Sequence, residues 1–89
     1  MIQYTSDGRA FVHRDDLSDE SSTRMLLIFE AEIDAAYGTG TDVLTVATRA
    51  AERVEARAIV TGTDPAAAEV IRNSAMEFYA YLITRTVGA

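Results

Sequence analysis

The chain has 89 residues, which allows one small domain with a thin core, because domains of this size bury only about two-thirds of the surface that the unfolded chain exposes. It contains no cysteine, which excludes disulfides and thiolate metal sites. Fourteen acidic residues against eight basic ones give a net charge of -6, which disfavours free nucleic acid as a partner, since phosphate binding needs a concentrated positive surface. All eight basic residues are arginine, which is typical of a GC-rich genome or of an acidic, high-salt cytoplasm such as that of haloarchaea.

Residues 1–18 are predicted to form an N-terminal extended arm or short hairpin. The turn dipeptide Asp7-Gly8 separates two short segments in which apolar residues alternate. A two-stranded hairpin alone is marginal in water, so this arm should lie on the helices or pair with another chain. Its candidate interface residues are Ile2, Tyr4, Phe11 and Val12. The same segment is too often interrupted by polar residues to be a signal peptide, and no apolar run is long enough to span a membrane.

The segment from Arg14 to Thr23 is polar and acidic. Its acidic residues do not have the alternating spacing and the glycine of a calcium loop, so we expect no bound metal. We interpret the segment as a solvated connector, with Ser18 or Asp19 as the cap of the following helix.

Residues 19–89 are predicted to form an all-α, three-helix domain. A first helix should run from about Glu20 to Tyr37 and end at the C-cap glycine Gly38, and a second should start at Thr41 or Asp42 and end before Gly62. The predicted inward face of the first helix is Leu26, Phe29, Ile33 and Ala36 or Tyr37, and that of the second is Leu44, Ala47, Ala51, Val54 and Ala58.

The third helix should span Asp64 to Arg85, because Asp64 is a good N-cap and Pro65 suits the first helical position. Its predicted inward stripe is Ala67, Ile71, Ala75, Phe78 and Leu82. Further apolar residues lie outside that stripe, so the helix has more apolar surface than two companion helices can cover. Short connections also favour antiparallel neighbours.

An arginine row on the second helix, Arg49, Arg53 and Arg57, repeats every four residues. Like charges at this spacing repel unless they are relieved. Glu52 and Glu55 are near enough to offset them on a solvated face. Alternatively, the row pairs with carboxylates of an adjacent subunit, where bidentate geometry adds specificity.

Two tyrosines near the end of the chain, Tyr79 and Tyr81, are candidates for packing between subunits or for an aromatic binding patch. The other interpretation is a core edge whose hydroxyls reach water. No catalytic arrangement is evident: His13 is the single histidine, and the chain has neither a nucleophile elbow nor a phosphate-binding glycine loop. We therefore expect no enzymatic activity and no cofactor.

The stretches Asp42 to Ala58 (DVLTVATRAAERVEARA) and Asp64 to Arg85 (DPAAAEVIRNSAMEFYAYLITR) resemble the head-tail connector, or adaptor, proteins of tailed phages and related archaeal viruses. The resemblance covers about half of the chain and does not extend to residues 1–22. It implies a structural virion protein of the viral neck, assembled in the host cytoplasm. Its implied partners are further copies in a ring, most often twelvefold, a portal protein above and a tail-completion protein below. DNA would pass through the ring without specific binding, since acidic walls repel phosphate.

Two other functions remain open at this point. A small helical regulatory or antitoxin-like dimer would act as a binding module, and it predicts a two-fold species with a basic recognition helix. A small helical enzyme would need an acid-base site, for which Glu69, Arg72 and Glu77 are the available residues.

Overall fold

The computed structural model describes the backbone of residues 2–87 and the side chains of residues 2–81. It contains strands β1 (Ile2–Tyr4) and β2 (Ala10–Val12), a short 3-10 helix η1 (Arg14–Asp16), and helices α1 (Asp19–Ala36), α2 (Val43–Val60) and α3 (Pro65–Val87). The expected all-α domain of three helices with a short N-terminal hairpin is therefore confirmed.

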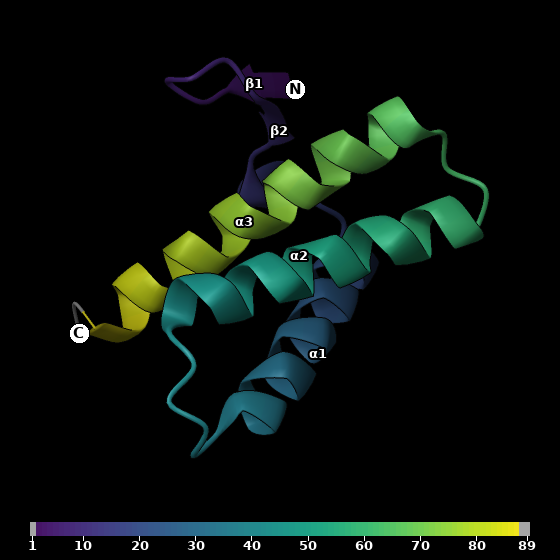
Figure 1. The fold of residues 1–89 in the computed structure, drawn as a ribbon. Helices are drawn as coiled ribbons and strands as arrows, with labels where there is room; N and C mark the ends of the chain where they lie inside the picture. The colour runs from purple at the N-terminus through teal and green to yellow at the C-terminus, as the bar shows by residue number, and fades with distance from the viewer. Residues whose placement is uncertain (1, 88–89) are drawn as a thin grey trace.

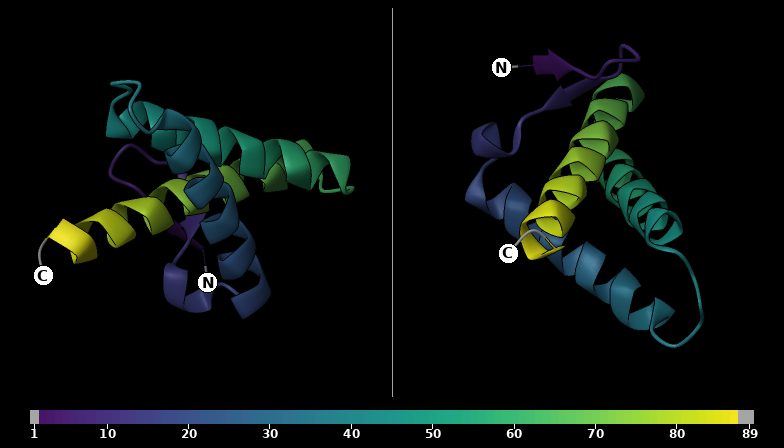
Figure 2. Two further views of the ribbon diagram at one scale, coloured as in Figure 1. Left: turned by 90° about the horizontal axis from the view of Figure 1, so that it is seen from below. Right: turned by 90° about the vertical axis from the view of Figure 1, so that its left-hand side faces the viewer.

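The helices form two packed layers. Helices α2 and α3 lie side by side in opposite directions, joined by a short turn (Figure 1). Helix α1 instead crosses them at a steep angle, as Figure 2 shows. The antiparallel arrangement expected from short connections thus holds for α2 and α3 and not for α1.

Side-chain caps and glycines set the ends of the helices. Ser18, Asp42 and Asp64 each accept a hydrogen bond from a backbone N–H group of the first turn that follows, at 3.1, 2.8 and 2.9 Å. These bonds satisfy donors that have no partner inside the helix. Gly38 and Gly62 have φ angles of +78° and +103° in the turns that follow α1 and α2. Only glycine adopts such angles without steric cost.

The core is built around one aromatic pair. Phe29 of α1 is completely buried, and its ring stacks on Tyr79 of α3 with centroids 4.7 Å apart and planes 7° from parallel. Small residues of α2 allow the helices to approach closely around this pair. The buried cluster consists of Met25, Ile28, Phe29, Ala47, Ala50, Ala51, Val54, Ala75 and Tyr79.

Part of each predicted inward face is wrong. On α1, Leu26, Ile33 and Tyr37 are exposed, while Met25 and Ile28 accompany Phe29 in the core. The first half of α1 is apolar nearly all round, so its helical periodicity is compatible with two inward faces that are shifted by about one residue. Packing against the other helices decides which of these two faces is buried.

The other two helices show smaller shifts of the same kind. Leu44 is exposed and Val46 is buried at the start of α2. On α3, Ala67 is exposed and Ala68 is buried. The side chain of Leu82, the last member of the predicted α3 stripe, lies outside the described residues.

The N-terminal hairpin packs on α3 and does not extend away from the domain. Its strands pair in antiparallel register with Ile2 opposite Val12, and its turn has Gly8 at a φ angle of +86°. The side-chain amide of Asn73 donates to the Ala10 carbonyl at 2.9 Å, and the Ser74 hydroxyl accepts from the Val12 amide at 2.7 Å. These two polar side chains are buried, so they hold β2 against α3 while β1 stays on the outside.

Candidate interaction surface

The arginine row of α2 is divided between two environments. Arg53 pairs with Glu32 of α1, with 2.9 Å between Nη1 and Oε1. Glu55 instead approaches Arg72 of α3 at 3.8 Å. Arg49 and Arg57 make no ion pair with any side chain described for residues 2–81. The ion pairs of α2 with described side chains therefore join helices of one protomer, and the pairing of the arginine row with an adjacent subunit stays a prediction.

The two tyrosines predicted for assembly are engaged within the protomer. Tyr79 is buried beneath Phe29, so its packing role lies in the core. Tyr81 is half-buried, and the Arg14 guanidinium lies over its ring, 3.8 Å from the centroid. This cation–π contact attaches the η1 segment to the end of α3.

Large apolar side chains remain exposed at several places on the surface. In the hairpin, Ile2 and Tyr4 are exposed, whereas Phe11 and Val12 are half-buried against α3. Of the interface residues predicted in the hairpin, Ile2 and Tyr4 of the exposed strand β1 are therefore the two that remain accessible to a partner. The other exposed large apolar residues are Leu26, Leu27, Ile33 and Tyr37 on α1 and its cap, and Val43, Leu44, Ile59 and Val60 on α2.

Tyr37 is the most exposed of these residues, at 90%. The sequence pattern assigned it to the inward face of α1, because it follows Ile33 by four residues. It actually stands at the C-cap, where the chain turns away towards Gly38. An aromatic residue directly before a C-cap glycine is the signal that could have identified it as a surface residue.

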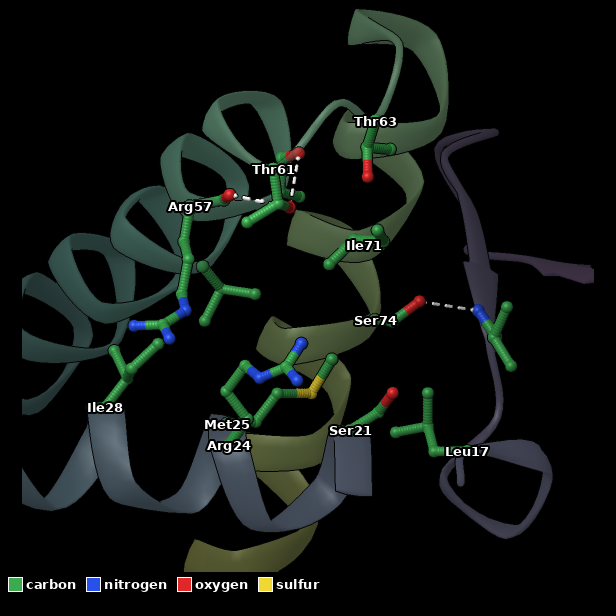
Figure 3. Close-up of a pocket in the computed structure, with 13 residues that line it drawn as sticks. Leu17, Ser21, Arg24, Met25, Ile28, Arg57, Thr61, Thr63, Ile71 and Ser74 are labelled. Atoms are coloured by element: carbon green, nitrogen blue, oxygen red, sulfur yellow. Dashed lines mark hydrogen bonds between the residues drawn. The ribbon is translucent and has the colours of Figure 1, made fainter. Parts of the chain in front are cut away.

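A cavity of about 160 Å³ lies where α1, α2, α3 and β2 meet (Figure 3). Its wall includes the apolar side chains of Met25, Ile28, Val54 and Ile71. The hydroxyls of Ser21, Thr61, Thr63 and Ser74 also line it. The space is therefore apolar with hydroxyl groups at its edge, which suits one amphipathic group.

Two arginines stand at the entrance of this cavity. Arg24 of α1 and Arg57 of α2 line both the cavity and a shallow groove outside it. Arg24 pairs with the exposed Glu20 at 2.8 Å. Arg57 lies in the last turn of α2, where the negative end of the helix dipole offsets part of its charge. The groove is also lined by Asp19 and Glu20, so its charges nearly balance, and Arg57 is the arginine there that makes no ion pair with a described side chain.

The described carboxyl groups with shifted pKa values lie in turns and caps. Hydrogen bonds from the Thr5 hydroxyl and then from Arg9 lower the pKa of Asp7 in the hairpin turn. The backbone N–H of Thr45, followed by its hydroxyl, lowers the pKa of Asp42 at the start of α2. Both shifts follow from bonds that stabilise the charged form, and neither group is near the cavity.

His13 has a structural role at the start of η1. Its Nδ1 accepts a hydrogen bond from the Asp15 amide at 3.2 Å, so the ring acts as an N-cap. Its Nε2 lies 3.2 Å from Arg14. The histidine is half-buried.

Searches for two further kinds of site give negative results within the described part of the chain. No group of three or more histidine, aspartate or glutamate side chains in residues 2–81 is placed to hold a metal ion. None of the described helices has both the length and the apolar character needed to cross a membrane.

Comparisons with protein-family models, with curated proteins and with solved structures found no match to this chain.

Proposed function

We propose that this chain is a structural adaptor that assembles into a homo-oligomeric ring, as a head-tail connector between the portal and the tail of a tailed virus. The observation that carries the proposal is the exposed apolar surface of α1. Leu27 is 60% exposed, Ile33 is 43% exposed, and Tyr37 at the C-cap is 90% exposed. A single exposed leucine needs no explanation, but apolar side chains gathered on one helix are typical of a contact surface.

The spacing of these residues supports a continuous surface. Leu26 and Ile33 are seven residues apart, which places them on one face of α1, and Tyr37 stands at the C-cap of the same helix. Val43 and Leu44 follow across the short connection to α2. A partner that covered this face would bury several large side chains, each worth about 1.5–3 kcal/mol when it is fully removed from water.

The shape of the protomer also supports a role in assembly. The core that the chain encloses by itself relies on one aromatic pair and many alanines, so it is thin. Small domains commonly gain stability by oligomerisation. A ring supplies this stability through contacts that every copy makes twice, once on each side.

The test is to produce the chain alone and together with the portal protein encoded by the same genome. We expect a closed ring bound to the portal, counted by native mass spectrometry and seen by electron microscopy. The variant Leu26→Asp/Ile33→Asp should weaken assembly about tenfold or more, because it places charge in an apolar contact. The matched control is Ala56→Asp, on the exposed side of α2.

Three results would count against the adaptor function. A genome without a portal gene would contradict it at once. A two-fold species that ignores the portal would favour the regulatory or antitoxin-like dimer. Equal assembly by the α1 variant and its control would show that the α1 surface has no part in the contact.

A further inference from the structure

We propose that Tyr37 of one copy enters the cavity between α1, α2 and α3 of the next copy, and that Asp34 beside it pairs with Arg57 at the entrance. This contact rests on the proposed ring function and names the surfaces that would join neighbouring subunits. Each copy carries both halves, so the contact runs head to tail.

The size of the cavity matches one aromatic ring. It measures about 160 Å³. An apolar cavity of about 150 Å³ in another protein stays dry and binds benzene. Sites for cofactors and other small molecules are usually about 300–1,000 Å³. The cavity is therefore suited to a single side chain and too small for an ordinary cofactor.

The lining of the cavity matches a tyrosine. Met25, Ile28 and Val54 would contact the ring faces and edge. The Thr63 hydroxyl points towards this space in Figure 3 and has no hydrogen bond within the described residues. A buried tyrosine needs a partner for its own hydroxyl, and Thr63 can accept or donate that bond.

Each half has beside it one charged group that makes no ion pair with a described side chain, and the two groups have opposite charge. Asp34 lies three residues before Tyr37, so the two side chains are neighbours on the last turn of α1. Asp34 makes no ion pair with a described side chain, and neither does Arg57. A carboxylate brought to the entrance would pair with the guanidinium of Arg57, in the geometry that favours two parallel hydrogen bonds.

The two halves are too far apart to meet within one copy. Thirteen residues separate Arg24 at the cavity from Tyr37, which is roughly 20 Å along a helix that rises 1.5 Å per residue. In Figure 1 the connection between α1 and α2 lies at one end of α1, and the last turn of α2 lies towards the other end of α1. A contact between two different patches is heterologous, and repetition of it closes a ring when the rotation allows.

The absence of cysteine makes a direct test by cross-linking possible. The substitutions Ile33→Cys and Thr61→Cys, introduced together, would place one thiol beside the tyrosine and one on the cavity wall, and they leave the Thr63 hydroxyl in place. Within a copy, Glu32 next to Ile33 pairs with Arg53, and Thr61 follows Arg53 by eight residues, which is roughly 12 Å along a helix. A link made by a short bismaleimide reagent within one copy leaves the chain monomeric, so species larger than one chain can come only from links between copies. The control pair is Ile33→Cys with Glu77→Cys, since Glu77 lies on the hairpin side of α3.

We expect a ladder of dimers, trimers and larger species from the first pair, with the chain alone or bound to the portal. Adding Tyr37→Ala or Arg57→Glu should lower the yield about tenfold, as expected for the loss of one anchor of the contact. Both residues are exposed, so these variants should fold normally. Restoring the ladder by combining Arg57→Glu with Asp34→Arg would identify the ion pair itself.

Failure of this contact is distinguishable from failure of the adaptor function. No ladder in either condition, an equal ladder from the control pair, or an unchanged ladder after Tyr37→Ala would overturn the tyrosine contact. If rings still form on the portal in those cases, the adaptor function stands with other subunit surfaces. If no ring forms with the portal, the adaptor function itself is contradicted.

Discussion

Replacement of Phe29 by alanine should remove a large part of the stability of the protomer. Phe29 is completely buried and stacks on Tyr79 at 4.7 Å, so its loss deletes both the buried ring and the aromatic contact. Core Phe→Ala substitutions cost about 3–5 kcal/mol because the cavity left behind closes only in part. Domains are stable by only about 5–15 kcal/mol in total, so this one change removes about a fifth or more of the stability of the domain.

Urea denaturation followed by far-ultraviolet circular dichroism, in dilute solution, measures this effect. In a thermal melt followed by the same signal, the melting temperature should fall by about 12 °C or more, since each kcal/mol shifts a domain of this size by about 4–8 °C. The matched control is Leu27→Ala on the same helix, where the side chain is 60% exposed and the cost should stay within about 0.5 kcal/mol. A loss below about 1 kcal/mol for Phe29→Ala, or equal losses for both variants, would refute this account of the core.

Three further predictions concern polar contacts. Asn73→Ala should leave the Ala10 carbonyl of β2 without its buried hydrogen-bond partner and lower the unfolding free energy by about 1–3 kcal/mol. It should also speed hydrogen exchange of the hairpin amides, and unchanged exchange would contradict the role of Asn73 in anchoring the hairpin. At Asp42 the hydrogen bonds from the backbone N–H and the hydroxyl of Thr45 lower the pKa below 3.8, so the cap stabilises the fold fully above that pH, and its stabilisation is lost as the pH falls through the lowered pKa. The difference in unfolding free energy between the wild type and Asp42→Asn should therefore shrink on acidification, and a constant difference would be inconsistent with this role of the charged cap. The pair Arg53–Glu32 joins α2 to α1 and is partly exposed, since 53% of the arginine side chain and 18% of the glutamate side chain are accessible to solvent. A double-mutant cycle should give a coupling of about 0.2–1 kcal/mol that decreases with salt, and a coupling above about 2 kcal/mol would mean that water screens the pair far less than the exposure of Arg53 indicates.

Local features were predictable from the sequence because they depend on neighbours in the chain. The caps Ser18, Asp42 and Asp64 and the glycine turns at Gly38 and Gly62 lie where the residue types indicate. Each is a choice of backbone conformation or of a hydrogen bond within a few residues. The helix boundaries differ from the predicted ones by one or two residues at most of these ends.

The candidate site could not be predicted, because three helices and β2 form it together. Arg24 and Arg57 are distant in sequence and meet only because α1 crosses α2. The arginine row had suggested a single charged face, but the fold directs Arg53 to α1 and leaves Arg57 at the cavity. A pattern of charges on one helix carries no information about which neighbour each charge will meet.

The sequence by itself determined three helices, their caps, a hairpin turn at Asp7-Gly8 and an excess of apolar helix surface. Only the tertiary structure decided which part of that surface is core. On α1 an apolar face nearly all round was compatible with more than one orientation, and stacking of Phe29 on Tyr79 selected the one that buries Met25 and exposes Tyr37. The physical reason is that helical periodicity specifies which residues share a face, whereas close packing with another helix decides which face is removed from water.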